Sequence, residues 1–143
     1  MNEAKVHPAA KENPGFLLWQ VSTLWSRSTS EALKPSGLNH PQFVILAVID
    51  SVKGKGVSQK EIEKQVVLDS KPALHLLRSL QVKKLVEIDE KNKYQLTAAG
   101  AKVFAEILPI IGNADAAFFT SINLKDSQMI TTLQTLAHAN SSE

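Results

Sequence analysis

The hydrophobic period of the chain changes from about 3.6 to 2 near residue 85, and this change restricts the possible folds more than any other feature. In the segment 70–84 the apolar residues follow the i, i+3, i+4, i+7 spacing of one buried helical face. That stripe consists of Ala73, Leu76, Leu77 and Leu80. In 86–89, and again in 93–96, apolar residues alternate with polar ones, which is typical of half-buried strands. The sequence therefore predicts a helix followed directly by two strands.

A polar stretch, 89–93, separates the two strands and predicts a hairpin turn in which Asn92 takes the left-handed conformation. Thr97 is expected to cap the helix that follows, and Pro109 is expected to kink or interrupt that helix. Asp126 is expected to cap a last helix.

Two short helices are expected before the hairpin. The motif Ser58-Gln-Lys-Glu61 is a capping box, in which the Ser58 hydroxyl and the Glu61 carboxylate bond to each other's free backbone amides. It predicts a helix over 58–66. Ser70 caps the next helix, which tolerates Pro72 in its first turn because no helical hydrogen bond is lost there.

The first helix, over 14–33, is apolar on more than one side. Such a helix is either central to a core or shared with a second subunit, and a chain this short favours the shared interface. The breaker run 34–37 closes it, and Pro41 opens a second helix that ends before the sequence Lys53-Gly-Lys-Gly56. That sequence forms a turn, since it lacks the Gly-Lys-Ser/Thr of a phosphate loop.

At 143 residues the chain has the length of one domain, and 43% hydrophobic with 21% charged residues is an ordinary globular composition. It has no cysteine, which excludes disulfides, thiolate metal sites and cysteine nucleophiles. No stretch approaches the ~18 consecutive apolar residues of a membrane span, and no signal-peptide core is present. We therefore expect a cytoplasmic protein without membrane contact.

The net charge of +2 is distributed unevenly. Residues 1–40 sum to +1, residues 41–102 to +4 (eleven basic and seven acidic), and residues 103–143 to −3 (one basic and four acidic). A polyanionic partner would therefore contact the middle of the chain.

Nothing in the sequence indicates an enzyme. It contains no G-x-S-x-G elbow, no His-Glu-x-x-His helix and no glycine-rich nucleotide fingerprint. The four histidines lack ligand spacing with carboxylates, so neither a metal site nor a cofactor is expected.

Two short helices followed by a hairpin make a winged helix-turn-helix, so the expected fold class is mostly α with a small β-hairpin wing. A helix fits the major groove of DNA, ~12 Å wide, where donors on the helix 70–84 could bond to base acceptors and Leu74 could contact a thymine methyl. The helix N-termini near Ser58 and Ser70 present free amides to phosphate oxygens. The candidate DNA-binding residues are Ser58, Gln59, Lys60, Ser70, Lys71, Ala73, Leu74, His75, Arg78, Lys91, Asn92 and Lys93.

Three stretches resemble the MarR family of multiple-antibiotic-resistance regulators: GLNHPQFVIL at 37–46, LDSKPALHLLRSLQVKKLV at 68–86 and LTAAG at 96–100. The resemblance covers about residues 15–138. It implies a homodimer built by the first and last helices, a winged helix on each arm that binds double-stranded DNA, and often a small aromatic effector between the two layers. It also implies transcriptional regulation, usually repression.

Under this resemblance 14–138 is a single MarR-like domain, flanked by tails at 1–13 and 139–143. Residues 41–98 form its winged helix-turn-helix core, and 14–40 with 99–138 form a helical dimerisation region. The candidate dimerisation residues are Phe16, Leu17, Trp19, Phe118, Phe119, Ile130, Leu133 and Leu136.

The chain departs from the family pattern at the wing and on the recognition helix. Members usually carry an Asp-x-Arg element in a longer wing, whereas this hairpin is shorter and has no arginine. Lys84 stands where glycine usually precedes the first wing strand, and Leu74 and His75 stand where the family tends to have Thr and Arg. The chain has only two arginines, Arg27 and Arg78, although bidentate arginine is the commonest specific base contact.

Alternatives to DNA binding stay open. Lys71, His75 and Arg78 could be only the solvated face of an amphipathic helix. A second alternative is that the outer face of 70–84 binds a protein partner in place of DNA, as the arginine-free wing and the apolar Leu74 suggest. A sensor that binds a ligand alone is a third option.

The two tryptophans also have two interpretations. Trp19 and Trp25 lie six residues apart on the first helix, and aromatic side chains often line effector pockets. Large aromatics on an apolar helix are more often core or dimer-interface anchors, which is the interpretation we favour.

Overall fold

The computed structural model describes residues 12–125 and 127–141. Its elements, in chain order, are α1 (Pro14–Leu33), the 3-10 turn η2 (Lys34–Ser36), α2 (His40–Ser51), α3 (Gln59–Val66), α4 (Ser70–Val82), β1 (Val86–Ile88), β2 (Tyr94–Leu96), α5 (Ala98–Phe118) and α6 (Met129–Asn140). This mostly helical fold with one antiparallel hairpin confirms the predicted fold class. No helix in the described part of the chain is long and apolar enough to cross a membrane.

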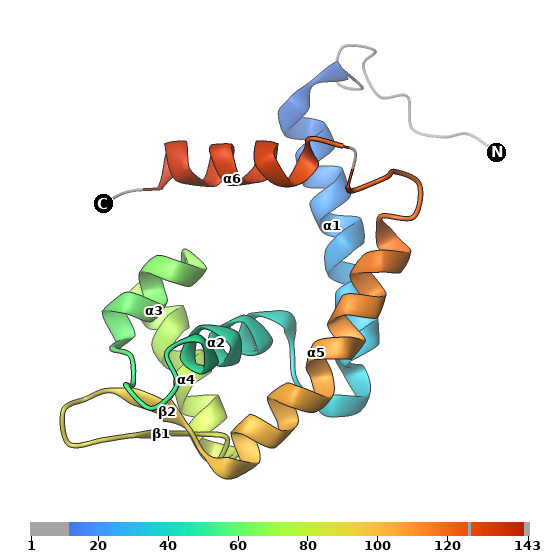
Figure 1. The fold of residues 1–143 in the computed structure, drawn as a ribbon. Helices are drawn as coiled ribbons and strands as arrows, with labels where there is room; N and C mark the ends of the chain where they lie inside the picture. Colours follow the sequence, from blue (N-terminus) through green and yellow to red (C-terminus); the bar gives the residue numbers. More distant parts are fainter. Residues whose placement is uncertain (1–11, 126, 142–143) are drawn as a thin grey trace.

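The elements form two groups (Figure 1). α2, α3, α4 and the hairpin cluster together, while α1 and α5 run side by side next to them. α6 lies at the end of α1 that is far from the hairpin. Most of the predicted tail 1–13 lies outside the described residues. The predicted tail 139–143 begins too early, because α6 continues to Asn140, whose side-chain amide donates to the Leu136 carbonyl (2.8 Å).

The hydrophobic core surrounds α2. Its fully buried side chains come from four helices and include Leu33, Ile45, Leu46, Ile62, Leu77 and Leu80. The rings of Phe43 in α2 and Phe104 in α5 stack at a centroid distance of 5.6 Å, which joins the two groups of elements. The predicted stripe of α4 is confirmed, since Ala73, Leu77 and Leu80 are fully buried and Leu76 is half-buried.

The helix caps agree with the sequence in part. Thr97 caps α5 as predicted, and its hydroxyl accepts from the Gly100 amide (3.0 Å). At α3 the Ser58 half of the predicted box forms, with the Glu61 amide donating to the Ser58 hydroxyl (3.2 Å). Ser70 is not a cap but the first residue of α4, and the preceding residue, Asp69, occupies the N-cap position.

Asp126, predicted to cap the last helix, lies outside the described residues, and α6 begins later, with Gln128 at its N-cap position. A complete capping box occurs instead at α2. There the Gln42 amide donates to Asn39 Oδ1 and the Asn39 amide donates to Gln42 Oε1, both at 2.9 Å.

The Gln42 side chain also contacts α4. It is almost fully buried, and its Nε2 donates to the Ser79 hydroxyl of α4 (2.9 Å). Ser79 in turn donates to the Leu76 carbonyl (2.7 Å). α2 and α4 are therefore joined by a buried polar contact as well as by apolar packing.

Of the two predicted effects of Pro109, a kink or an interruption, the interruption does not occur, because α5 runs continuously through this residue. Pro109 and Ala105, the residue four positions earlier, are both exposed, and water can therefore hydrate the carbonyl that the proline leaves without a donor. The ribbon of α5 changes direction between its two halves, as expected for a proline kink (Figure 1).

The start of α5 lies directly against the residues that lead into the wing. The Thr97 amide donates to the Leu85 carbonyl (3.0 Å), and the Thr97 hydroxyl donates to the Lys84 carbonyl (2.7 Å). A Cβ atom added to Gly100 would lie 1.9 Å from the Leu85 oxygen, so only glycine fits there. Lys84 has φ 62°, the left-handed conformation that suits the glycine usual at this position.

Candidate nucleic-acid interface

A short turn orients α4 against α3. α3 ends in a left-handed residue, Val67 (φ 55°), and the Leu68 amide closes the helix by donating to the Glu63 carbonyl (3.1 Å). The Gln59 side chain spans both helices, since its Nε2 donates to the Glu63 carboxylate (3.0 Å) and to the Ser70 carbonyl (3.2 Å). These contacts produce a helix-turn-helix.

The outward face of α4 carries hydrogen-bond donors. Lys71, His75 and Arg78 are exposed, and Leu74 is half-buried. The prediction of Ala73 as a DNA-binding residue is wrong, because its side chain is 0% exposed and belongs to the core stripe. The half-burial of Leu74 also limits how much apolar surface this face offers to another protein.

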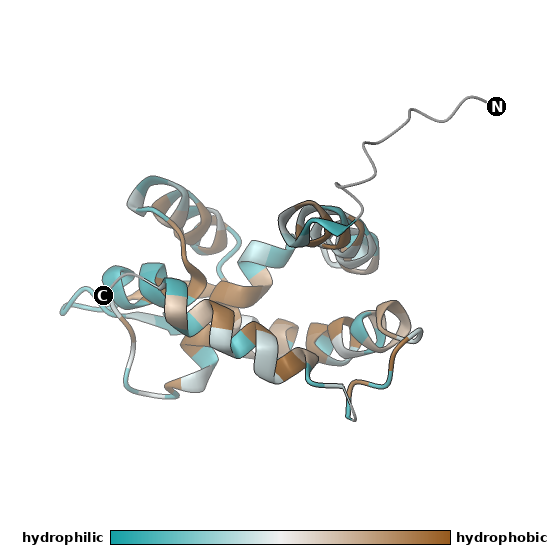
Figure 2. Cartoon of the chain, turned by 90° about the horizontal axis from the view of Figure 1, so that it is seen from above, coloured by the Kyte–Doolittle hydropathy of each residue, from teal (hydrophilic) through white to brown (hydrophobic). Residues whose placement is uncertain are grey.

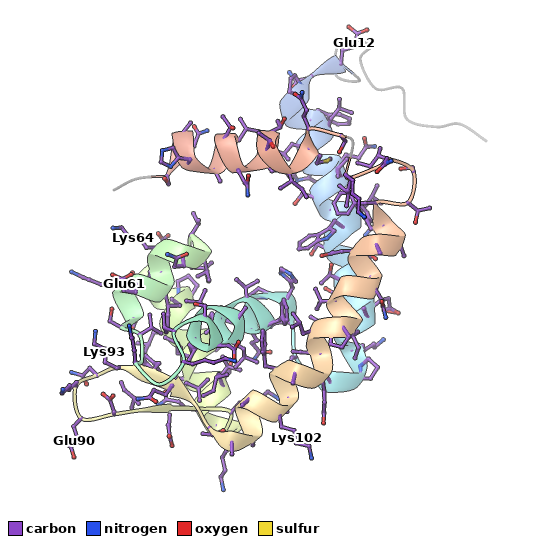
Figure 3. The ribbon with its side chains drawn as sticks, in the orientation of Figure 1. Glu12, Glu61, Lys64, Glu90, Lys93 and Lys102 are labelled. Carbon is purple, nitrogen blue, oxygen red and sulfur yellow. The ribbon has the colours of Figure 1, made fainter. Side chains whose placement is uncertain are left out.

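At the N-terminus of α3, two of the three candidate side chains already have partners. Ser58 accepts a hydrogen bond in the cap, and Gln59 bonds to Glu63 and Ser70. Lys60 is exposed. Figure 3 shows Glu61 and Lys64 extending outward from the same helix, so the charges on α3 are mixed in sign.

The predicted hairpin forms, with Val86 paired to Leu96 and Ile88 to Tyr94. Asn92 has the predicted left-handed conformation (φ 61°). The carboxylate of Asp89 holds the turn of this hairpin together.

Asp89 Oδ1 accepts from the backbone amides of Lys91 (2.8 Å) and Lys93 (3.0 Å). The bond from the Lys93 amide is the main cause that lowers the pKa of Asp89, and the Lys91 amide and the Gln95 side chain also lower this pKa. The wing therefore holds its shape through an ionised aspartate.

The three candidate residues of the wing differ in position. Lys91 and Asn92 are exposed in the turn. Lys93 is half-buried and lies beside the turn that follows α2. Figure 3 shows Lys93 on the α3 side of the wing and Glu90 at its tip.

The candidate dimerisation residues form exposed apolar surface on α1 and α6. Trp19 is 66% exposed, and the other exposed members of the set are Leu17, Ile130, Leu133 and Leu136. Phe16, Phe118 and Phe119 are half-buried, and the last two rings pack edge to face at 5.1 Å. Figure 2 shows hydrophobic and hydrophilic stretches alternating along α6. Exposed apolar helix faces of this kind are typical of subunit interfaces.

The two tryptophans differ in environment: Trp19 is exposed, whereas Trp25 belongs to a cluster that the sequence did not predict. The Trp25 indole Nε1 donates to Asp115 Oδ1 (2.8 Å), and the Trp25 ring packs edge to face on His40 (4.6 Å). His40 also lies 5.8 Å from the Phe43 ring. The Trp25–His40–Asp115 cluster thus joins α1, α2 and α5, where the two groups of elements meet.

Burial lowers the pKa of His40, and the nearby Asp115 carboxylate opposes this effect in part. Since the ordinary pKa is 6.5, the unfolded chain binds a proton at a pH where folded His40 stays neutral. The contribution of neutral His40 to the free energy of unfolding is therefore complete above pH 6.5. It is lost as the pH falls toward the lowered pKa of His40 in the folded state.

We therefore expect the free energy of unfolding to fall on acidification from pH 7.5 to 5.5, and to fall less in His40→Gln. Urea unfolding across this range measures both slopes. His75→Gln, on the exposed face of α4, is the matched control. Equal slopes for wild type and His40→Gln would exclude His40 as the source of the pH dependence.

In the described residues, no group of three or more histidine and carboxylate side chains is placed to hold a metal ion.

No protein-family model matches the chain. It is 28% identical over 134 residues to the uncharacterized HTH-type transcriptional regulator YdcH of Bacillus subtilis (strain 168), covering 88% of this chain and 91% of that protein.

Solved structures of MarR proteins share the fold. A MarR-family transcriptional regulator from Rhodococcus sp. RHA1 is 26% identical with a TM-score of 0.83, over 92% of this chain and 98% of that one. CouR from Rhodococcus jostii RHA1, bound to p-coumaroyl-CoA, is 25% identical with a TM-score of 0.84, over 96% and 100% of the two chains. The Mycobacterium tuberculosis MarR-family protein Rv2887, in complex with DNA, is 24% identical with a TM-score of 0.71, over 87% and 97%.

Proposed function

Because this chain belongs to the MarR family of DNA-binding transcriptional regulators, which are not enzymes, we propose that it acts as a homodimeric repressor. Its recognition helix would be α4, and its operator a pseudo-palindromic site. The observation that carries the proposal is the exposed donor face of α4, directly followed by the hairpin. The DNA-binding core would be 41–98, and the dimerisation region 14–40 with 99–138.

The apolar faces of α1 and α6 support the homodimer. A twofold axis through this surface would present two recognition helices to successive major grooves, about 34 Å apart. Phosphate contacts would come from Lys60 and Ser70, and base contacts from Lys71, His75 and Arg78.

A small aromatic effector is the second element of the proposal. CouR, a similar structure, is bound to p-coumaroyl-CoA and is the precedent for such a ligand. In this chain Trp25 lies at the junction of α1, α2 and α5, where a bound ring could alter the angle between the two groups of elements.

Fluorescence anisotropy with the promoter duplex and with a random duplex, at about 50 to 200 mM salt, tests DNA binding. We expect tighter promoter binding and a slope of log affinity against log salt of about −0.9 per neutralised phosphate. Lys71→Ala and Arg78→Ala should each lower promoter affinity about 5- to 150-fold, that is, by about 1–3 kcal/mol.

Val82→Ala, at the C-terminal end of the same helix, is the control and should bind as the wild type does. Unchanged binding by both the Lys71 and Arg78 variants would exclude α4 as the recognition helix. A weak, salt-independent response of the wild-type protein would instead favour the protein-partner alternative, which rests mainly on the arginine-free wing.

A further inference from the structure

The turn between α2 and α3 is fixed against the wing by backbone contacts. The Val57 amide donates to the Tyr94 carbonyl (3.0 Å), and the Tyr94 amide donates to the Val57 carbonyl (2.7 Å). One residue earlier, Gly56 has φ 72°, and a Cβ added there would lie 2.7 Å from the Lys93 Cβ. The glycine therefore lets the turn lie directly on the base of the Lys93 side chain.

This arrangement gathers lysines from two separate segments. Lys55 of the turn and Lys91 and Lys93 of the wing border one open depression of about 750 Å³. Its other lining residues are Gly54, Ile88, Asp89, Glu90 and Gln95. Within residues 12–125 and 127–141, none of the three lysines makes a salt bridge.

The depression is lined by three lysines and two carboxylates, so its net charge is +1. Asp89 stays ionised, because it accepts two backbone amides of the turn and one side-chain amide, and its charge attracts Lys91. Glu90 lies at the wing tip, and Lys93 lies on the side of α3 (Figure 3). Positive charge therefore predominates where the turn meets the wing.

We propose that Lys55, Lys91 and Lys93, here called the turn–wing surface, bind phosphates of the DNA backbone beside the recognition helix. Lys55 is the new assignment, since the turn 53–56 had no role in the site described above. The proposal rests on the proposed DNA-binding function. Lysine is a compact point charge that suits phosphate, and a wing without arginine lacks the bidentate group that suits bases.

The position of the surface favours DNA over other polyanions. Val57 leads directly into the N-terminus of α3, and Lys60 on the first turn of that helix is exposed. The turn–wing surface and the exposed N-terminus of α3 are thus adjacent, and both offer groups that bind phosphate oxygens.

The same turn contains a matched control. Lys53 is exposed like Lys55, but it borders a different cavity, against Phe104 and Leu108 of α5, and does not line the depression beside the wing. Lys53→Ala and Lys55→Ala remove the same charge from the same turn, so a general electrostatic effect would be equal in both.

The test is fluorescence anisotropy of the wild-type chain and both variants between about 50 and 200 mM salt. In Lys55→Ala the slope of log affinity against log salt should decrease in magnitude by about 0.9 for each bound subunit. Between about 50 and 200 mM salt, the fold-change in affinity should therefore be smaller by about 3.5-fold per subunit, or about 12-fold for a homodimer. The loss should be the same for promoter and random duplexes, because a phosphate contact carries no sequence information. Lys53→Ala should keep the wild-type slope.

Equal slopes for Lys55→Ala and Lys53→Ala would overturn the inference and leave the proposed function intact. A loss confined to the promoter duplex would also overturn it, since that result indicates base recognition. If the wild-type protein shows no salt-dependent binding, both the inference and the proposed function fail. Matching circular dichroism and unfolding midpoints of the variants confirm that neither change affects the fold.

Discussion

Gly100→Ala is expected to lower the free energy of unfolding by about 3 kcal/mol, because the added methyl group overlaps the backbone rather than a side chain that can move. The new Cβ would lie 1.9 Å from the Leu85 carbonyl oxygen and 2.8 Å from its carbon. Relief requires α5 to move away from the residues before β1, which breaks the Thr97 bonds to Lys84 and Leu85. Urea unfolding at fixed protein concentration measures the loss.

Gly112→Ala, in the same helix, is the control. Apart from the neighbouring residues and backbone of α5 itself, no described atom lies within 4 Å of a Cβ at this position. Alanine should therefore raise the stability by about 0.5–1 kcal/mol through its higher helix propensity. The two substitutions are chemically identical and opposite in expected sign. Equal effects would show that the contact at Leu85 does not limit position 100.

Trp19→Ala is expected to weaken the proposed homodimer by about 2 kcal/mol or more, roughly a 30-fold rise in its dissociation constant. Trp19 is the most exposed aromatic side chain of the apolar surface on α1, and a second subunit would bury it. Sedimentation equilibrium over a range of protein concentrations gives the dissociation constant directly.

Val82→Ala tests whether any exposed apolar residue has this effect. Val82 is 83% exposed at the end of α4, away from the apolar surface of α1 and α6, and its removal should leave the dissociation constant unchanged. Trp19→Phe should recover most of the affinity, because it keeps an aromatic ring. A fully dimeric Trp19→Ala protein would show that Trp19 is no interface anchor and would favour its alternative role in an effector pocket.

The sequence predicted the elements well where the signal is local. The change of period near residue 85 correctly predicted α4 and both strands. Asn92 and Thr97 correctly predicted the hairpin turn and the start of α5. Helix starts were predicted less well, because several polar residues near a helix start can serve as its cap. Asp69 therefore took the N-cap position predicted for Ser70.

The candidate site was predictable as far as it follows helical periodicity. Lys71, His75 and Arg78 lie outside as expected, and the same rule places Ala73 in the core. The position of Lys93 against Gly56 was not predictable, because it depends on how a turn and a strand far apart in the chain pack together.

The Trp25–His40–Asp115 cluster was missed for the same reason, since 90 residues separate Trp25 from Asp115. The capping box at Asn39 did have a local signal, an Asn followed three positions later by Gln before an apolar run.

The single carboxamide of Gln42 links the start of α2 to α4. One end of this group fixes where α2 begins, and the other end holds Ser79 on α4. If α2 rotates about its N-terminus, α4 must turn with it or lose a buried hydrogen bond, at a cost of about 1–3 kcal/mol. His40 lies two residues away, in the joint with α1 and α5. A tilt of α1 and α5 against the winged helix would therefore rotate α4, the proposed recognition helix, without any ligand touching that helix.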